Sequence, residues 1–99
     1  MSNETMVVAE TIRAQLGGRA LYMLGAKDLV GSENALQFTI RGSRKVSKIR
    51  IELTPADTYT VRFYRGRGLN LKEIASVEDV YVDSLHQTIE KHTGLITSL

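Results

Sequence analysis

The middle of the chain alternates between apolar and polar residues over three successive segments, 35–41, 47–54 and 57–65. Because neighbouring side chains of a strand point to opposite faces of a sheet, the pattern predicts three strands with one buried and one solvated face. Turn-forming connections such as Pro55-Ala56-Asp57 favour an antiparallel order. The alternation predicts burial of Leu36, Phe38, Ile40, Ile49, Ile51, Leu53, Tyr59, Val61 and Phe63.

The start of the chain has helical spacing instead. Val8, Ile12 and Leu16 recur every four residues, which is the interval that places side chains on one face of a helix. We therefore expect a helix over residues 4–16. Gly17 is placed to end it, because glycine readily adopts the left-handed backbone found after helices.

The end of the chain has a second helical pattern. Residues 76–79 resemble a capping box, and the helix they predict continues to about Thr93, where Gly94 ends it. The buried stripe predicted for this helix is Val82, Leu85 and Ile89.

Two further segments, 20–26 and 69–75, are interpreted as additional strands, and the segment 27–34, which is rich in turn-forming residues, is interpreted as a loop. Together these elements predict one α+β domain over residues 1–99. Its order is an N-terminal helix, an antiparallel meander of four to five strands and a C-terminal helix, with both helices on one face of the sheet.

Composition limits the setting of such a domain. Hydrophobic residues make up 42% of the 99 residues and charged residues 24%, which is typical of a chain that folds. The chain has no cysteine, so disulfides are excluded and a reducing compartment is favoured. No leader pattern and no apolar stretch of about 18 residues is found, so we expect a cytoplasmic protein without a membrane partner.

The sequence offers little for catalysis. Asp79, Asp83, His86 and Glu90 fall on one side of the predicted C-terminal helix, but their spacing matches no recognised metal motif. We interpret them as a solvated stripe. No nucleophile elbow and no phosphate-binding loop with its lysine occurs. The prediction is a protein that is not an enzyme and uses no cofactor or metal.

Charge is the main functional signal. Residues 41–67 contain eight basic and two acidic residues, whereas the rest of the chain has a net charge of −4. The alternation places several cations on the outer sheet face, together with an exposed aromatic ring, and two arginines follow in a loop. The candidate contacts are Arg41, Lys48, Arg50, Arg62, Tyr64, Arg65 and Arg67.

Two kinds of partner fit this basic face. The first is a protein, either with an acidic surface or as a second copy paired along an edge strand. The alternative is single-stranded DNA or RNA, with the cations on phosphates and Tyr64 stacked on a base. The sequence favours the protein partner and leaves the oligomeric state open.

Five segments together resemble a family of small proteins encoded by bacteriophages and prophages: QLGG (15–18), GAKDLVGSENAL (25–36), LTPADTYTV (53–61), DVYVDSL (79–85) and TGL (93–95). The resemblance covers about the whole domain. It implies a phage gene product in the bacterial cytoplasm that acts by binding nucleic acid or a host protein, such as a defence or regulatory factor. It transfers no catalytic or binding residue to this chain.

Overall fold

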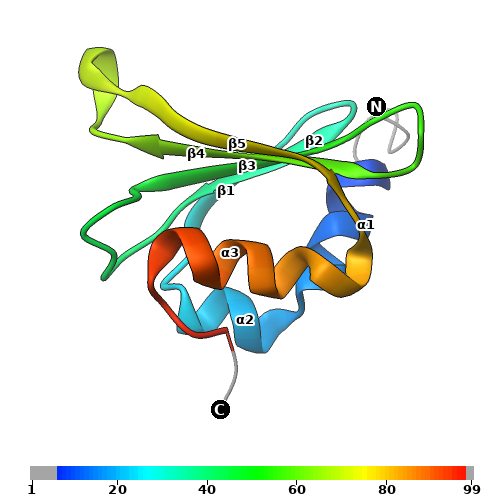
Figure 1. Cartoon of the computed structure of the whole chain (residues 1–99), viewed down its shortest axis with the longest axis horizontal. Helices are drawn as coiled ribbons and strands as arrows, with labels where there is room; N and C mark the ends of the chain where they lie inside the picture. Colours follow the sequence, from blue (N-terminus) through cyan, green and yellow to red (C-terminus); the bar gives the residue numbers. More distant parts are fainter. Residues whose placement is uncertain (1–6, 98–99) are drawn as a thin grey trace.

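The computed structural model describes residues 7–97, in which helices cover one face of a five-stranded antiparallel sheet (Figure 1). The strands follow the order β1-β2-β3-β4-β5, so each strand pairs with its neighbour in sequence. This is the predicted α+β meander. The elements in chain order are α1 (Val7–Leu16), α2 (Gly18–Met23), β1 (Lys27–Gly31), β2 (Ala35–Thr39), β3 (Lys48–Leu53), β4 (Tyr59–Arg65), the 3₁₀ turn η2 (Gly68–Asn70), β5 (Lys72–Val80), the 3₁₀ turn η3 (Val82–Ser84) and α3 (Leu85–Thr93).

The three central strands form as the alternation predicts. Ile49 of β3 lies between Phe38 of β2 and Phe63 of β4, and all three side chains are fully buried. The β3–β4 connection is the predicted turn: Asp57 donates its backbone N–H to the carbonyl of Thr54 at 3.0 Å. The apolar residues of the alternation are buried except Leu53, which is partly buried against the core.

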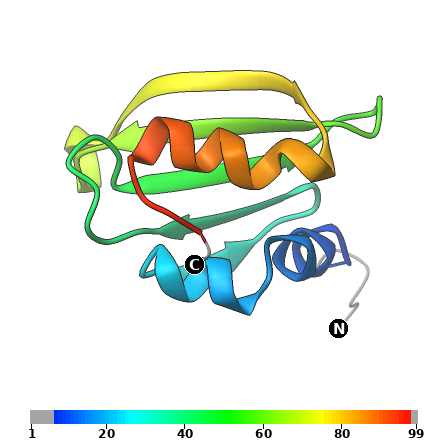
Figure 2. The same ribbon diagram turned by 60° about the horizontal axis from the view of Figure 1, so that its bottom comes forward.

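The helices lie on one face of the sheet (Figure 2). Their apolar side chains join the buried core on that face. Helix α1 contributes the buried Ile12 and Leu16, and Val8 packs against the core while partly exposed. Gly17 ends α1 with a positive φ of 87°, but its ψ of 151° is not that of the expected left-handed conformation. The predicted start of this helix at residue 4 lies outside the described residues.

Helix α3 ends as predicted, with Gly94 in the left-handed conformation after Thr93. Leu85 and Ile89 are buried. Within residues 7–97, no helix is long and apolar enough to cross a membrane.

The strand predicted over residues 20–26 is wrong, because this segment begins with the short helix α2. Within the segment, Ala20, Leu21 and the following Leu24 are buried, and this spacing places side chains on one side of a helix. The first strand, β1, lies instead in the segment 27–34 that was interpreted as a loop.

The helix predicted from residues 76–79 is also wrong at its start. Strand β5 continues to Val80, and regular helix begins only at Leu85. Val82, predicted to be buried, lies in the 3₁₀ turn η3 and is 51% exposed. Asp79 belongs to a strand, so it cannot share a helical stripe with His86 and Glu90.

Both edge strands contain irregular pairing at an aspartate with a left-handed backbone. The pairing of β1 with β2 shifts between Lys27 and Val30, where Asp28 has φ 56°. The pairing of β4 with β5 shifts near Asp79, which has φ 57°. Bulges twist an edge away from an incoming strand, so both edges are shaped against the edge pairing that the sequence allows. Dimerisation itself stays a prediction.

Candidate functional site

The outer face of the sheet carries an ion-pair network rather than a row of free cations. Arg50 of β3 donates to Glu52 at 2.7 Å and to the side-chain oxygen of Gln37 at 3.0 Å. Arg62 of β4 donates to Glu52 at 3.2 Å and to Glu73 at 3.3 Å. Two of the predicted contact residues are therefore committed to carboxylates of their own chain.

The acidity of Glu52 reflects this pairing. Burial opposes ionisation of the carboxyl, but the hydrogen bonds and charges of Arg50 and Arg62 outweigh it and hold the Glu52 pKa below its ordinary value. A carboxylate shared by two guanidinium groups neutralises much of their charge. The centre of the outer face consequently offers little positive potential to a ligand.

Tyr64 is a weaker platform for stacking than the sequence suggests. Its side chain is partly buried, and burial together with the nearby Glu73 raises the pKa of its phenol. In the sheet it lies beside Lys48 of β3 and Glu73 of β5. The ring is thus packed among the side chains of the outer face.

The register of the sheet gathers the remaining cations at one end, on the left in Figure 1. Lys27 pairs with Thr39, Thr39 with Lys48 and Lys48 with Tyr64, so strands β1 to β4 all reach this end together. Arg65 and Lys72 then form the last pair of β4 with β5. We call this group of residues the basic end: Lys27, Arg41, Arg44, Lys45, Lys48, Arg65, Arg67 and Lys72.

Two adjoining surface hollows are formed by the basic end. One, of about 340 Å³, is lined by the cations Lys27, Arg41 and Arg67 and by one acidic residue, Asp28. The other, of about 240 Å³, is lined by Arg44, Arg65 and Arg67. Arg67 lines both, so cations from three segments of the chain surround one concave surface.

In the described part of the chain, the cations of the basic end form no ion pair, whereas Arg50 and Arg62 do. Arg41 lies beyond the last residue of β2, and its backbone N–H donates to the carbonyl of Leu24 at 3.0 Å. The structure therefore places Arg41 in the basic end rather than on the outer face, where the alternation predicts it.

Serine hydroxyls hold the loops of the basic end in place. Ser47 donates to the carbonyl of Gly66 at 2.7 Å, which joins the loop before β3 to the β4–β5 hairpin. Ser43 donates to the carbonyl of Thr93 at 2.7 Å and accepts the backbone N–H of Val46 at 3.1 Å. These bonds fix loops that would otherwise move independently.

The opposite end of the sheet has the opposite charge. Its connections and strand ends carry Glu33, Asp57, Glu78, Asp79 and Asp83. The molecule is thus electrically polarised along its strands. Such a field orients the basic end toward an anionic partner during approach.

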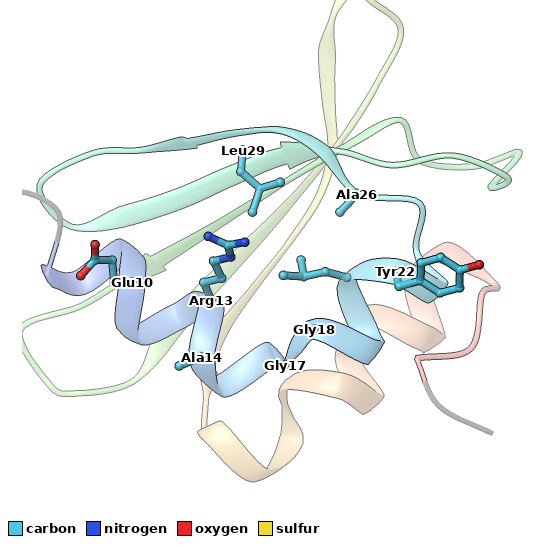
Figure 3. A pocket seen from close by; sticks show the side chains of 9 residues that line it. Glu10, Arg13, Ala14, Gly17, Gly18, Tyr22, Ala26 and Leu29 are labelled. Carbon is cyan, nitrogen blue, oxygen red and sulfur yellow. The ribbon is translucent and has the colours of Figure 1, made fainter.

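A shallow pocket of about 570 Å³ lies between α1, α2 and β1 (Figure 3). Arg13 points across it toward Leu29, while Glu10 and Tyr22 point away from it. The side chain of Arg13 is the main polar group within it. Its scattered polar groups contrast with the convergent cations of the basic end.

The two histidines have structural contacts. His86 Nε2 is 2.7 Å from the carbonyl oxygen of Leu16, which links α3 to the end of α1. His92 stacks on the buried Phe63 with ring centroids 4.6 Å apart. Glu90 accepts hydrogen bonds from the backbone and hydroxyl of Thr97, and these lower its pKa. Over residues 7–97, no three His, Asp or Glu side chains group so as to hold a metal ion.

The structure divides the predicted contact set. It brings Arg41, Arg65 and Arg67 together around the two hollows and separates them from the ion-paired Arg50 and Arg62. Lys48 lies at the same end of the sheet, paired with Tyr64, but lines neither hollow. The sequence prediction lacks the other cations of the basic end. Their positions follow from the meander, in which alternate connections return to the same end of the sheet. The missing cations are Lys27, Arg44, Lys45 and Lys72.

Comparisons of this chain with protein-family models, with curated proteins and with solved structures give no match.

Proposed function

We propose that this protein is a non-catalytic binding module that holds the phosphate backbone of a nucleic acid against its basic end. The observation that carries the proposal is the pair of adjoining hollows that share Arg67 and are lined by further cations from separate segments. Phosphate contacts need cations distributed along a surface rather than a single charge. The basic end supplies that distribution.

The character of the surface favours phosphate over an acidic protein. At the centres of stable protein interfaces aromatic and apolar side chains dominate, with arginine among them, whereas lysine is depleted. The centre of the basic end consists of Arg67, Arg65 and Arg41 around Ser47 and Gly66. A host protein as partner, which the sequence favours, is therefore the second candidate. The acidic far end of the sheet would also repel an acidic protein that covered the whole molecule.

The outer face of the sheet does not contact the ligand in this proposal. Arg50 and Arg62 already hold Glu52, so recruiting them for phosphate would break existing ion pairs. We expect nucleic acid to contact the end of the sheet and to leave its outer face open. The bacteriophage setting implied by the sequence resemblance is compatible with such a module in a bacterial cytoplasm.

Fluorescence anisotropy with matched charge variants tests the proposal. The double variant Arg41→Gln/Arg67→Gln removes two cations of the basic end. Arg13→Gln/Arg19→Gln removes two exposed cations from the helical layer and serves as the control. At about 0.15 M salt, the basic-end variant should bind a labelled DNA duplex roughly tenfold more weakly than wild type. The control should remain within about twofold of wild type.

Equal losses in the two variants would show that only net charge matters, and the assignment of the basic end would fail. If wild type itself did not bind, nucleic acid would be excluded. A stoichiometric protein captured from nuclease-treated bacterial lysate would then favour the second candidate, provided that the basic-end variant lost it.

A further inference from the structure

The β4–β5 hairpin reaches beyond the rest of the basic end. Strand β3 makes its last pair at Lys48 with Tyr64, whereas β4 and β5 pair once more at Arg65 and Lys72 before the chain turns. The resulting loop, 66–71, projects past the neighbouring connections (Figure 1). We call it the hairpin tip.

The hairpin tip is a fixed turn. Asn70 donates its backbone N–H to the carbonyl of Arg67 at 3.0 Å, and Leu71 donates to that of Gly68 at 3.2 Å. Gly66 has φ 100°, and a β-carbon there would lie 2.4 Å from the Asn70 carbonyl oxygen. The turn is closed so tightly that only glycine fits at this position.

Leu69 stands at the apex of this turn with its side chain 104% exposed, the most exposed large apolar residue in the described chain. Arg67 precedes this leucine and Lys72 follows it. Burying the exposed leucine side chain against a partner would contribute favourably to the free energy of binding. Its position is suited to a narrow site between two rows of negative charge.

We propose that Leu69 enters the minor groove of duplex DNA as an apolar wedge, with Arg65, Arg67 and Lys72 against the phosphates on either side. This inference rests on the proposed function and names its ligand. Proteins that bind the minor groove commonly insert leucine or another apolar side chain between base steps and bend the duplex. A narrow minor groove also attracts arginine strongly.

The choice of duplex over single strand follows from the chemistry of the tip. Single-strand binding surfaces use aromatic rings, because bases stack on them. Leucine has no such ring, and the exposed tyrosines, Tyr22 and Tyr81, belong to α2 and to the segment after β5 rather than to the hairpin tip. Tyr64 is packed into the outer face.

A duplex of about 20 base pairs, labelled at both ends with a fluorescence-transfer pair, reports binding and bending together. Wild type should raise transfer between the ends, and an A·T-specific minor-groove ligand should compete with it. Leu69→Ala should bind this duplex roughly 10- to 100-fold more weakly and lose the rise in transfer. It should keep the salt dependence of wild type, because no charge changes. Val82→Ala, which truncates an exposed residue at the acidic end, should behave as wild type.

The outcomes separate this inference from the proposed function. If Leu69→Ala bound and bent the duplex like wild type while Arg41→Gln/Arg67→Gln bound poorly, the wedge would be wrong and the phosphate-binding function would stand. If wild type bound no duplex, both would fall. If Leu69→Ala lost association with anionic lipid vesicles or with a lysate protein but kept duplex binding, the hairpin tip would be assigned to that partner instead.

Discussion

The hydroxyl of Ser47 donates a 2.7 Å hydrogen bond to the backbone carbonyl of Gly66. Ser47 belongs to the connection between β2 and β3, whereas Gly66 opens the hairpin tip, so one bond joins two separate loops of the basic end. Both residues line both hollows. The relative placement of the cations on these loops therefore depends on a bond that carries no charge itself.

Replacing Ser47 with alanine should weaken binding without changing its electrostatics. We expect Ser47→Ala to lose about 0.5–1.5 kcal/mol of stability and part of its affinity for duplex DNA, with an unchanged salt slope. Thr88→Ala is the matched control, because Thr88 makes a similar 2.8 Å bond to the carbonyl of Ser84, away from the basic end. Equal affinities of the two variants for duplex DNA would show that binding does not depend on the hydrogen bond between Ser47 and Gly66.

Two glycines of the hairpin tip should differ sharply in their tolerance of a side chain. Gly66→Ala places a β-carbon 2.4 Å from the Asn70 carbonyl at φ 100°, whereas at Gly68, with φ 56°, a β-carbon would meet nothing within 4 Å. We expect Gly66→Ala to cost roughly 1–3 kcal/mol in the free energy of unfolding and Gly68→Ala about 1 kcal/mol. Thermal denaturation of both variants measures the difference, and a larger loss at Gly68 would contradict the described turn.

Glu52 should make stability fall in acid. Its pKa is lowered in the folded protein, so its contribution is complete above the unfolded value of about 4.3 and is lost as pH falls through the lower folded value. Glu52→Gln should therefore cost about 0.5–1 kcal/mol at pH 7. As the pH falls below about 4, the unfolding free energies of Glu52→Gln and of wild type should converge. Denaturant titrations between pH 7 and 2.5 give both curves, and parallel curves would mean that the carboxylate contributes nothing.

Truncating Ile51 should lower the stability of the protein strongly. It is fully buried in the central strand, between Leu36 of β2 and Val61 of β4. Ile51→Ala should cost roughly 2–5 kcal/mol through the cavity that it leaves. Ile74→Ala removes the same atoms from a side chain that is 49% exposed and should cost about 0.5 kcal/mol or less. Similar denaturation midpoints for the two variants would place the core elsewhere.

The central strands were predictable because a period of two holds within each of the segments 35–41, 47–54 and 57–65. Strand β5 was predicted only in part: the segment 69–75 covers its first residues, 72–75, but the rest was assigned to the C-terminal helix, because the bulge at Asp79 adds a residue. The partly buried Val77 and the buried Val80 are thereby three residues apart, an interval that also suits a helix. The strand prediction for segment 20–26 was wrong for a related reason, because a run of five to seven apolar residues suits a short buried helix as well as a strand.

The site was only partly predictable. Alternation places Arg50 and Arg62 on the outer face, as observed, but their neutralisation depends on the pairing of β3, β4 and β5, which brings Glu52 and Glu73 within reach. Lys27 was missed because its segment was interpreted as a loop. The basic end emerges only when the register of all the strands is known.

The salt dependence of duplex binding tests the central claim most directly. A protein that neutralises phosphates releases counterions, so the logarithm of its affinity falls with the logarithm of salt concentration by about 0.9 per phosphate. For wild type, anisotropy titrations between about 0.05 and 0.2 M salt should give a slope of about 3 or more. The slope should decrease by about 1–2 in Arg41→Gln/Arg67→Gln. A slope near zero, or one that the double variant leaves unchanged, would contradict the assignment of the basic end to phosphate.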